Sequence, residues 1–167
     1  MTSKHYEILK KLDQEFNFLT PKDNFLLIGC RSTGALKYAS EVVNEGLVLG
    51  VDMEENITKE VREFSKEHDN VKIMGANPLK ESTWKEAEFR VQSTLNTLDT
   101  QPLKSIQGME NSLEVLVPGG KIATVYTQNN QGLIENFLSS LPLEKTKFIE
   151  VEGNLVSFSR RSKRAIF

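Results

Sequence analysis

The residues best suited to bind a ligand lie between Phe25 and Asp52. An apolar run, Phe25 to Ile28, stops in a small-residue turn, Gly29 to Gly34, and a second run, Leu47 to Val51, ends at Asp52. A strand that stops in a glycine turn and opens a helix leaves backbone N–H groups and the positive end of a helix dipole available to a ligand. An acid at the end of the next strand can accept hydrogen bonds from ribose hydroxyls. The segment therefore predicts a nucleotide-binding βαβ unit.

The same residues also have purely structural explanations. The glycines of the turn could serve backbone geometry alone. Asp52 could cap a helix, because Glu55 follows at the capping-box position, and the two roles of Asp52 could coexist. Cys30 follows a buried run and has no histidine or lysine beside it, so we expect an apolar filler rather than a nucleophile. The sequence names no catalytic residue.

Length and composition predict one domain that spans residues 1–167, because a chain of 167 residues can bury one core. Cys30 is the single cysteine, which excludes a disulfide framework and a cysteine-rich zinc site and indicates a reducing compartment, most simply the cytoplasm. His5 and His68 have no ligand partner at a suitable spacing, so we predict no metal site. No apolar run is long enough to span a bilayer, so no membrane contact is expected.

Hydrophobic periodicity predicts the elements that position these residues, as alternating helices and strands. Residues 89–95 alternate like a strand but could equally prolong a helix that begins near Trp84. A helix over 106–116 is expected to end at Pro118-Gly119-Gly120. The chain should close with a hairpin around Gly153. The predicted strands cover residues 25–28, 47–51, 71–74, 89–95, 121–126, 148–151 and 155–159, and the helices cover 8–16, 32–43, 57–64, 106–116 and 133–138.

This order of elements resembles that of the class I S-adenosylmethionine-dependent methyltransferases along nearly the whole chain. The segment Leu113 to Ala123 looks like the L-x-x-L-x-P-G-G segment that leads into the fifth strand of that superfamily. The spacing from Gly29 to Gly34, with Asp52 after the next strand, is similar to the RNA-modifying branches, which include fibrillarin-like ribose methyltransferases and tRNA adenine methyltransferases. The resemblance implies an α/β, three-layer Rossmann-like methyltransferase fold, with a mostly parallel sheet and a C-terminal antiparallel hairpin.

The resemblance also implies a cofactor, S-adenosylmethionine, and an RNA substrate. Gly29, Cys30 and Gly34 would line the methionine and ribose part of the cofactor. Asp52 would hold the ribose hydroxyls, and Met53 would lie against the adenine.

Several positions depart from the pattern of the superfamily. Arg31 stands where a glycine is usual, so it would either crowd the pocket or reach for the cofactor carboxylate. Asn77 is the only polar residue after the third strand, where many members place an acid that meets the adenine amino group. The segment Val91 to Asp99 carries no catalytic segment of the Asn-Pro-Pro-Tyr type. These departures favour an alternative, a degenerate methyltransferase-like subunit that binds a protein partner.

Two further hypotheses concern other ligands. A dinucleotide-dependent oxidoreductase ranks lowest, because the turn is not the G-x-G-x-x-G of NAD enzymes. The basic cluster Arg160 to Arg164 could contact RNA phosphates, or it could be a solvated final strand.

Overall fold

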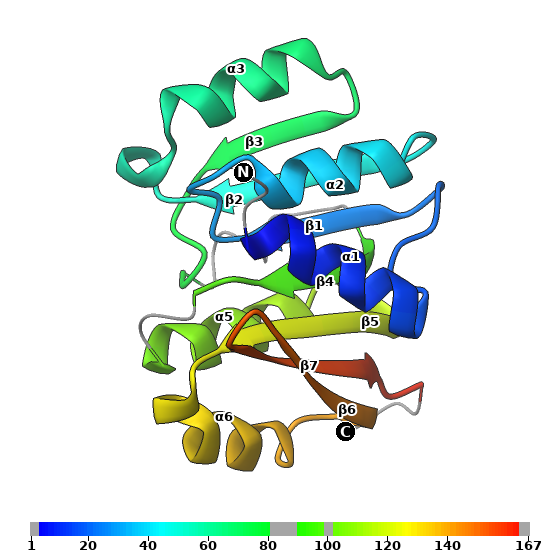
Figure 1. Cartoon of the computed structure of the whole chain (residues 1–167), viewed down its shortest axis with the longest axis vertical. Coiled ribbons are helices and arrows are strands. Elements are labelled where there is room, and N and C mark those ends of the chain that lie inside the picture. Colours follow the sequence, from blue (N-terminus) through cyan, green and yellow to red (C-terminus); the bar gives the residue numbers. More distant parts are fainter. Residues whose placement is uncertain (1–3, 81–89, 99–101, 164–167) are drawn as a thin grey trace.

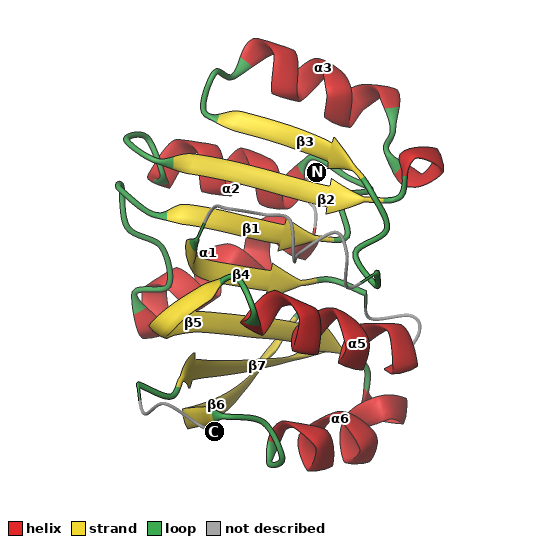
Figure 2. Cartoon of the chain, turned by 180° about the vertical axis from the view of Figure 1, so that it is seen from behind, coloured by secondary structure: helices red, strands yellow, loops and turns green. Residues whose placement is uncertain are grey.

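The fold consists of one seven-stranded sheet with helices on both faces (Figures 1 and 2). The computed structural model describes residues 4–80, 90–98 and 102–163. The strand order is β3-β2-β1-β4-β5-β7-β6. Strands β1 to β5 run parallel, and β7 runs antiparallel to both β5 and β6. The strands are β1 (Asn24–Ile28), β2 (Leu47–Asp52), β3 (Val71–Gly75), β4 (Val91–Asn96), β5 (Leu116–Tyr126), β6 (Leu143–Val151) and β7 (Asn154–Arg161). The helices are α1 (Lys4–Phe16), α2 (Gly34–Val42), α3 (Lys59–Glu67), α5 (Pro102–Leu113) and α6 (Gln131–Leu138), with short 3-10 turns η1 (Glu54–Asn56) and η2 (Gln128–Asn130).

The helices form two layers, so the molecule has three layers in all. Helices α1, α2 and α3 cover one face of the sheet, and α5 and α6 cover the other (Figures 1 and 2). One hydrophobic core packs with residues of α1 and α2, and a second packs with residues of α5 and α6. Leu27 belongs to the first core, whereas its neighbours Leu26 and Ile28 belong to the second. Because successive side chains of a strand point to opposite faces, a strand covered on both sides has to be apolar throughout. The predicted fold class is therefore confirmed.

The strand that the sequence left ambiguous is β4. It lies between β1 and β5, pairing Leu26 with Thr94 on one side and Ser93 with Lys121 on the other. The predicted strand over residues 89–95 is thus confirmed from Val91 onward. Phe89 and Trp84, on which the alternative helix depended, lie outside the described residues.

The expected end of the helix before β5 is wrong. Helix α5 ends at Leu113, and β5 begins at Leu116, so Pro118-Gly119-Gly120 lies inside a strand. Val91 lies opposite Leu116, and Ser93 lies opposite Lys121. A step of two residues along β4 is thus matched by a step of five residues along β5. Gly119 has φ of 78°. The Pro-Gly-Gly signal marks an irregularity, but here a sheet accommodates it as a bulge rather than a helix ending at it.

Two arginines of β7 hold this bulge. The guanidinium of Arg160 donates from Nη1 to the carbonyl oxygen of Gly119 at 3.3 Å. Arg161 donates from Nη1 to the carbonyl oxygen of Leu116. Two members of the basic cluster, Arg160 and Arg161, therefore stabilise the bulge, a role that neither the RNA hypothesis nor the solvated-strand hypothesis included.

Candidate nucleoside-binding site

The candidate site lies at the carboxyl ends of β1, β2 and β4, where their arrowheads in Figure 2 point the same way. Strand β1 is flanked by β2 and β4, and the chain leaves it toward β2 first and reaches β4 only later. Open α/β sheets bind ligands at such a switch point, outside the carboxyl ends of the strands. The turn Gly29 to Gly34 follows β1, Asp52 ends β2, and Thr97 follows β4.

Gly29 is required by the local packing. Its φ is 88°, a region that residues with a Cβ rarely adopt, and its N–H donates to the carbonyl oxygen of Val51 at 3.0 Å. A Cβ at this position would overlap Oγ1 of Thr97. That hydroxyl lies 2.8 Å from the carbonyl oxygens of both Ile28 and Gly29, and so ties β4 to the end of β1. The structural explanation of this glycine is sufficient without a ligand.

Asp52 is the centre of the site, and its side chain is only 2% exposed. Oδ2 accepts from the backbone N–H of Cys30 at 2.9 Å, and Oδ1 accepts from the backbone N–H of Met53 at 2.7 Å. Oδ1 also accepts from Nδ2 of Asn56 at 3.1 Å. The carboxylate therefore fixes the turn after β1 and the η1 turn at once. It binds the residues around η1 rather than completing a capping box with Glu55.

Cys30 has the properties of the apolar filler that the sequence predicted. It is fully buried, and its Sγ occupies the space that a Cβ on Gly50 would need. Burial, reinforced by the negative charge of Asp52, raises the pKa of the thiol to about 12. A thiol in this state holds its proton at neutral pH, so it is a poor nucleophile.

Arg31 lies beside Asp52 at the mouth of the candidate site. Its Nε lies 3.7 Å from Oδ2 of Asp52, while its side chain remains 64% exposed. The guanidinium thus sits over the buried carboxylate and reaches into solvent. A glycine at this position would leave that side of Asp52 uncovered.

The remaining predicted residues surround this centre. Gly34 is buried and opens α2, and Met53 is half-buried directly after β2. Asn77 lies two residues beyond β3, where its Oδ1 accepts from the backbone N–H of Leu79 at 2.9 Å. The structure joins Cys30, Arg31 and Met53 through contacts to Asp52. Asn77 is not among the hydrogen-bond partners that the described part of the chain offers to that carboxylate.

Sequence reasoning missed Glu54. Gly75 ends β3 directly opposite Asp52, and a Cβ on Gly75 would overlap Oε2 of Glu54. The Glu54 side chain is 69% exposed, and its Oε1 accepts from Nη2 of Arg62. An acid therefore does lie at the carboxyl end of β3, contributed by the turn after β2. The only local signal was the glycine at the end of β3, which leaves room for it.

Asn96, the last residue of β4, is held by internal hydrogen bonds. Asn96 is 1% exposed, and its Nδ2 donates to the carbonyl oxygen of Ser105 at 2.7 Å. Its Oδ1 accepts from the backbone N–H of Leu98 at 3.0 Å. Both ends of the amide are thus engaged in holding the chain between β4 and α5. Asp99 lies outside the described residues.

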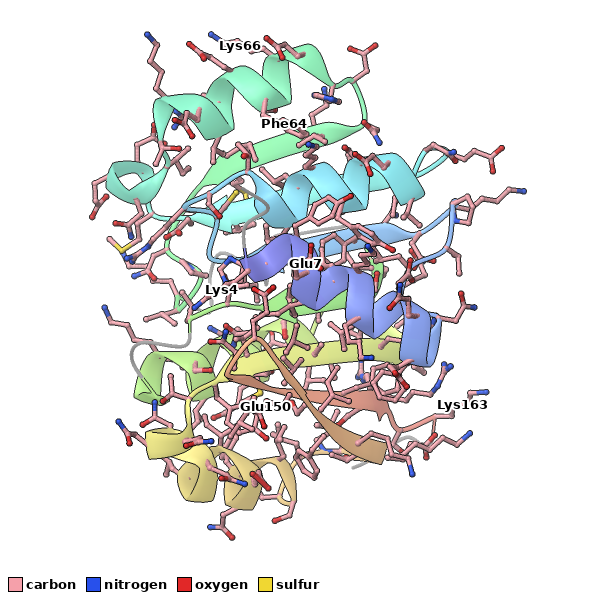
Figure 3. The ribbon with its side chains drawn as sticks, in the orientation of Figure 1. Lys4, Glu7, Phe64, Lys66, Glu150 and Lys163 are labelled. Atoms are coloured by element: carbon pink, nitrogen blue, oxygen red, sulfur yellow. The ribbon has the colours of Figure 1, made fainter. Side chains whose placement is uncertain are left out.

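The basic cluster lies at the opposite edge of the sheet. Because β7 is antiparallel, Arg160 pairs with Lys121 near the amino end of the parallel strands. Figure 3 shows Lys163 extending from that same side of the molecule. Strands β2 and β7 are also four strand-to-strand steps apart, and each step is about 4.8 Å, so the cluster lies roughly 20 Å or more from Asp52. Arg164 lies outside the described residues.

Within the described ranges, no group of three or more His, Cys, Asp or Glu side chains is arranged to hold a metal ion. Of the helices that the structure describes, none combines the length and the apolar character needed to cross a membrane.

The strand order and the covering of both faces by helices are those of the class I S-adenosylmethionine-dependent methyltransferases, and the chain has this fold. Three solved structures illustrate the likeness. Aeropyrum pernix fibrillarin with natively bound S-adenosyl-L-methionine superimposes with a TM-score of 0.76 at 13% identity, over 93% of this chain and 76% of that one. An rRNA methylase from Streptococcus thermophilus gives 0.71 at 10% identity, over 93% and 96%. Fibrillarin in a fibrillarin/Nop5p complex gives 0.75 at 11% identity, over 96% and 83%. No protein-family model and no curated protein sequence matches the chain.

Proposed function

We propose that this protein binds S-adenosylmethionine and transfers its methyl group to RNA. The observation that carries the proposal is the buried Asp52 at the end of β2, beside the Gly29-Cys30 turn at the switch point of a methyltransferase fold. A carboxylate at this place can accept from ribose hydroxyls. The fold neighbour from Aeropyrum pernix contains S-adenosyl-L-methionine, and other neighbours are fibrillarins and rRNA methylases, which supports the choice of cofactor and of substrate class.

The residues of this chain fit the cofactor in part. Asp52 supplies the acid for the ribose, Met53 supplies an apolar side chain next to it, and Glu54 supplies an acid near the end of β3. A bound cofactor would bring the sulfonium methyl group, and the chain would have to align an acceptor atom with it. Positioning alone can account for much of such a displacement, so the reaction does not require a general base on the chain.

RNA would have to approach along a defined path in this proposal. The acceptor nucleotide must reach the carboxyl edge, whereas Arg160 and Lys163 lie at the amino edge of the parallel strands. These basic groups can therefore contact only flanking phosphates and not the nucleotide that receives the methyl group. Phosphate contacts position a nucleic acid without reading its sequence.

A second function has an observation of its own. The hydrogen-bonding positions of Asp52 are occupied by Cys30, Met53 and Asn56, and both ends of the Asn96 amide are used internally. A site whose polar groups satisfy one another needs no ligand to be stable. We propose as the alternative a binding or scaffold subunit that has kept the fold, and the complex of fibrillarin with Nop5p is a precedent for a protein partner on this fold.

The experiment is a calorimetric titration of the purified protein with S-adenosylmethionine and with its demethylated product, S-adenosylhomocysteine. NAD serves as the comparison ligand, and Asp52→Asn serves as the site variant. Saturable binding of the first two ligands but not of NAD, weakened in the variant, supports the cofactor site and justifies a search for methylated RNA. Absence of heat at millimolar ligand would overturn the cofactor proposal and favour the scaffold subunit.

A further inference from the structure

The acceptor positions of Asp52 are almost fully used. A carboxylate offers roughly four lone-pair sites. Oδ1 receives two short hydrogen bonds, from Met53 N and Asn56 Nδ2, and Oδ2 receives one, from Cys30 N. Oδ2 therefore has one site left, and Arg31 Nε lies 3.7 Å from this oxygen. Judged by the contacts of the described residues, a ligand hydroxyl could bind the carboxylate at this position without breaking a short hydrogen bond.

The two partners of the Arg31–Asp52 pair are placed very differently. Asp52 is buried, whereas the Arg31 side chain is 64% exposed and can swing into water with little loss of hydration. When Arg31 moves away, three hydrogen-bond donors still stabilise the negative charge of the Asp52 carboxylate. Pairs with an exposed member are weak and sensitive to salt. The guanidinium is thus a removable cover, held in place mainly by electrostatic attraction.

We propose that Arg31 gates the nucleoside site, so that a ribose hydroxyl reaches Oδ2 of Asp52 only after the guanidinium has moved away. The inference rests on the proposed function, because it gives the site a ligand that carries ribose hydroxyls. Arg31 is then a specificity-determining residue, since every ligand that uses Asp52 competes with it. The gate weakens the binding of neutral nucleosides, which bring no anionic group to attract the displaced guanidinium.

The test uses neutral probes, so that changes in ligand charge do not confuse the result. Adenosine and 2′,3′-dideoxyadenosine, which lacks both hydroxyls, are titrated into wild-type protein and Arg31→Ala. Lys59→Ala is the matched control, because it also removes one exposed positive charge, from an ion pair with Glu63 on α3. Thermal unfolding of each variant shows whether the fold is retained.

The gate predicts that Arg31→Ala binds adenosine about two- to fivefold more tightly than the wild type, the range expected for loss of a weak ion pair. Dideoxyadenosine should bind all three proteins equally, and Lys59→Ala should match the wild type. Raising the salt concentration should bring wild-type affinity for adenosine toward that of Arg31→Ala, because salt weakens the competing pair. Equal or weaker adenosine binding by Arg31→Ala overturns the gate.

The outcomes for the gate and for the cofactor proposal are separable. If Arg31→Ala gains affinity for adenosine while no variant binds S-adenosylmethionine, the gate stands and the cofactor proposal fails. If the wild type binds S-adenosylmethionine and Arg31→Ala leaves adenosine binding unchanged, the gate fails and the cofactor proposal stands. If neither protein binds either ligand, both fail, because removing the cover should have exposed a usable carboxylate.

Discussion

Replacing Asp52 by alanine should destabilise the folded protein strongly, whether or not it binds a ligand. Alanine removes the acceptor of three donors, two of which are the backbone N–H groups of Cys30 and Met53. A buried donor left without a partner costs about 1–3 kcal/mol. Asn56 can turn its amide to water, so the two backbone groups dominate. We expect a loss of about 2–5 kcal/mol in the free energy of unfolding.

Urea denaturation followed by circular dichroism measures this loss directly. For a chain of this length each kcal/mol shifts the melting temperature by about 2–4 °C, so in a thermal melt the midpoint should fall by roughly 4–20 °C. Glu55→Ala is the matched control, because Glu55 is an exposed acid in the adjoining η1 turn, where substitution typically changes stability by less than about 0.5 kcal/mol. A stability of Asp52→Ala within about 0.5 kcal/mol of the wild type would refute the assignment of Asp52 as a structural hub.

Three further predictions concern stability. Gly29→Ala should cost about 2–4 kcal/mol in urea denaturation, because of its φ of 88° and the overlap with Thr97, whereas Gly132→Ala in α6, which has open space, should be neutral or slightly stabilising. Thr124→Val should be neutral or stabilising by up to about 1 kcal/mol, because the buried Oγ1 of Thr124 has no hydrogen-bond partner in the part of the chain described; a clear loss of stability would argue for a bound water. The raised pKa of Cys30, about 12, favours the neutral thiol in the folded state, so the advantage in stability of the wild type over Cys30→Ala should be complete below about pH 9 and shrink as the pH rises toward 12; a constant difference contradicts this.

The sequence predicted the fold well where the signal was local. The apolar run of β1 and the acid that ends β2 were readable because a strand covered on both faces is continuously apolar and the next strand repeats the pattern. The Pro118-Gly119-Gly120 segment misled, because the same residues end a helix or form a bulge depending on the partner strand. That partner is separated from it by many residues in the sequence.

The sequence predicted where the candidate site lies but not the contacts that its side chains make. The spacing of Gly29 and Asp52 placed both residues at one edge of the sheet. The position of Arg31 over Asp52 and of Glu54 against Gly75 depends on how separate strand ends meet in space, which no local pattern encodes. Electrostatic pairs between separate elements are for this reason the part of a site that a single sequence predicts least.

The antiparallel course of β7 has a practical consequence for handling the protein. Because β7 runs antiparallel to β5, its last residues, Arg160 and Arg161, lie toward the amino ends of the parallel strands and away from Asp52. An attachment made at the β7 end of the sheet would therefore be on the opposite side of the sheet from the carboxyl edge. Immobilisation through such an attachment presents the candidate site to ligands in flow, and surface-based binding measurements can be oriented without any change to the residues around Asp52.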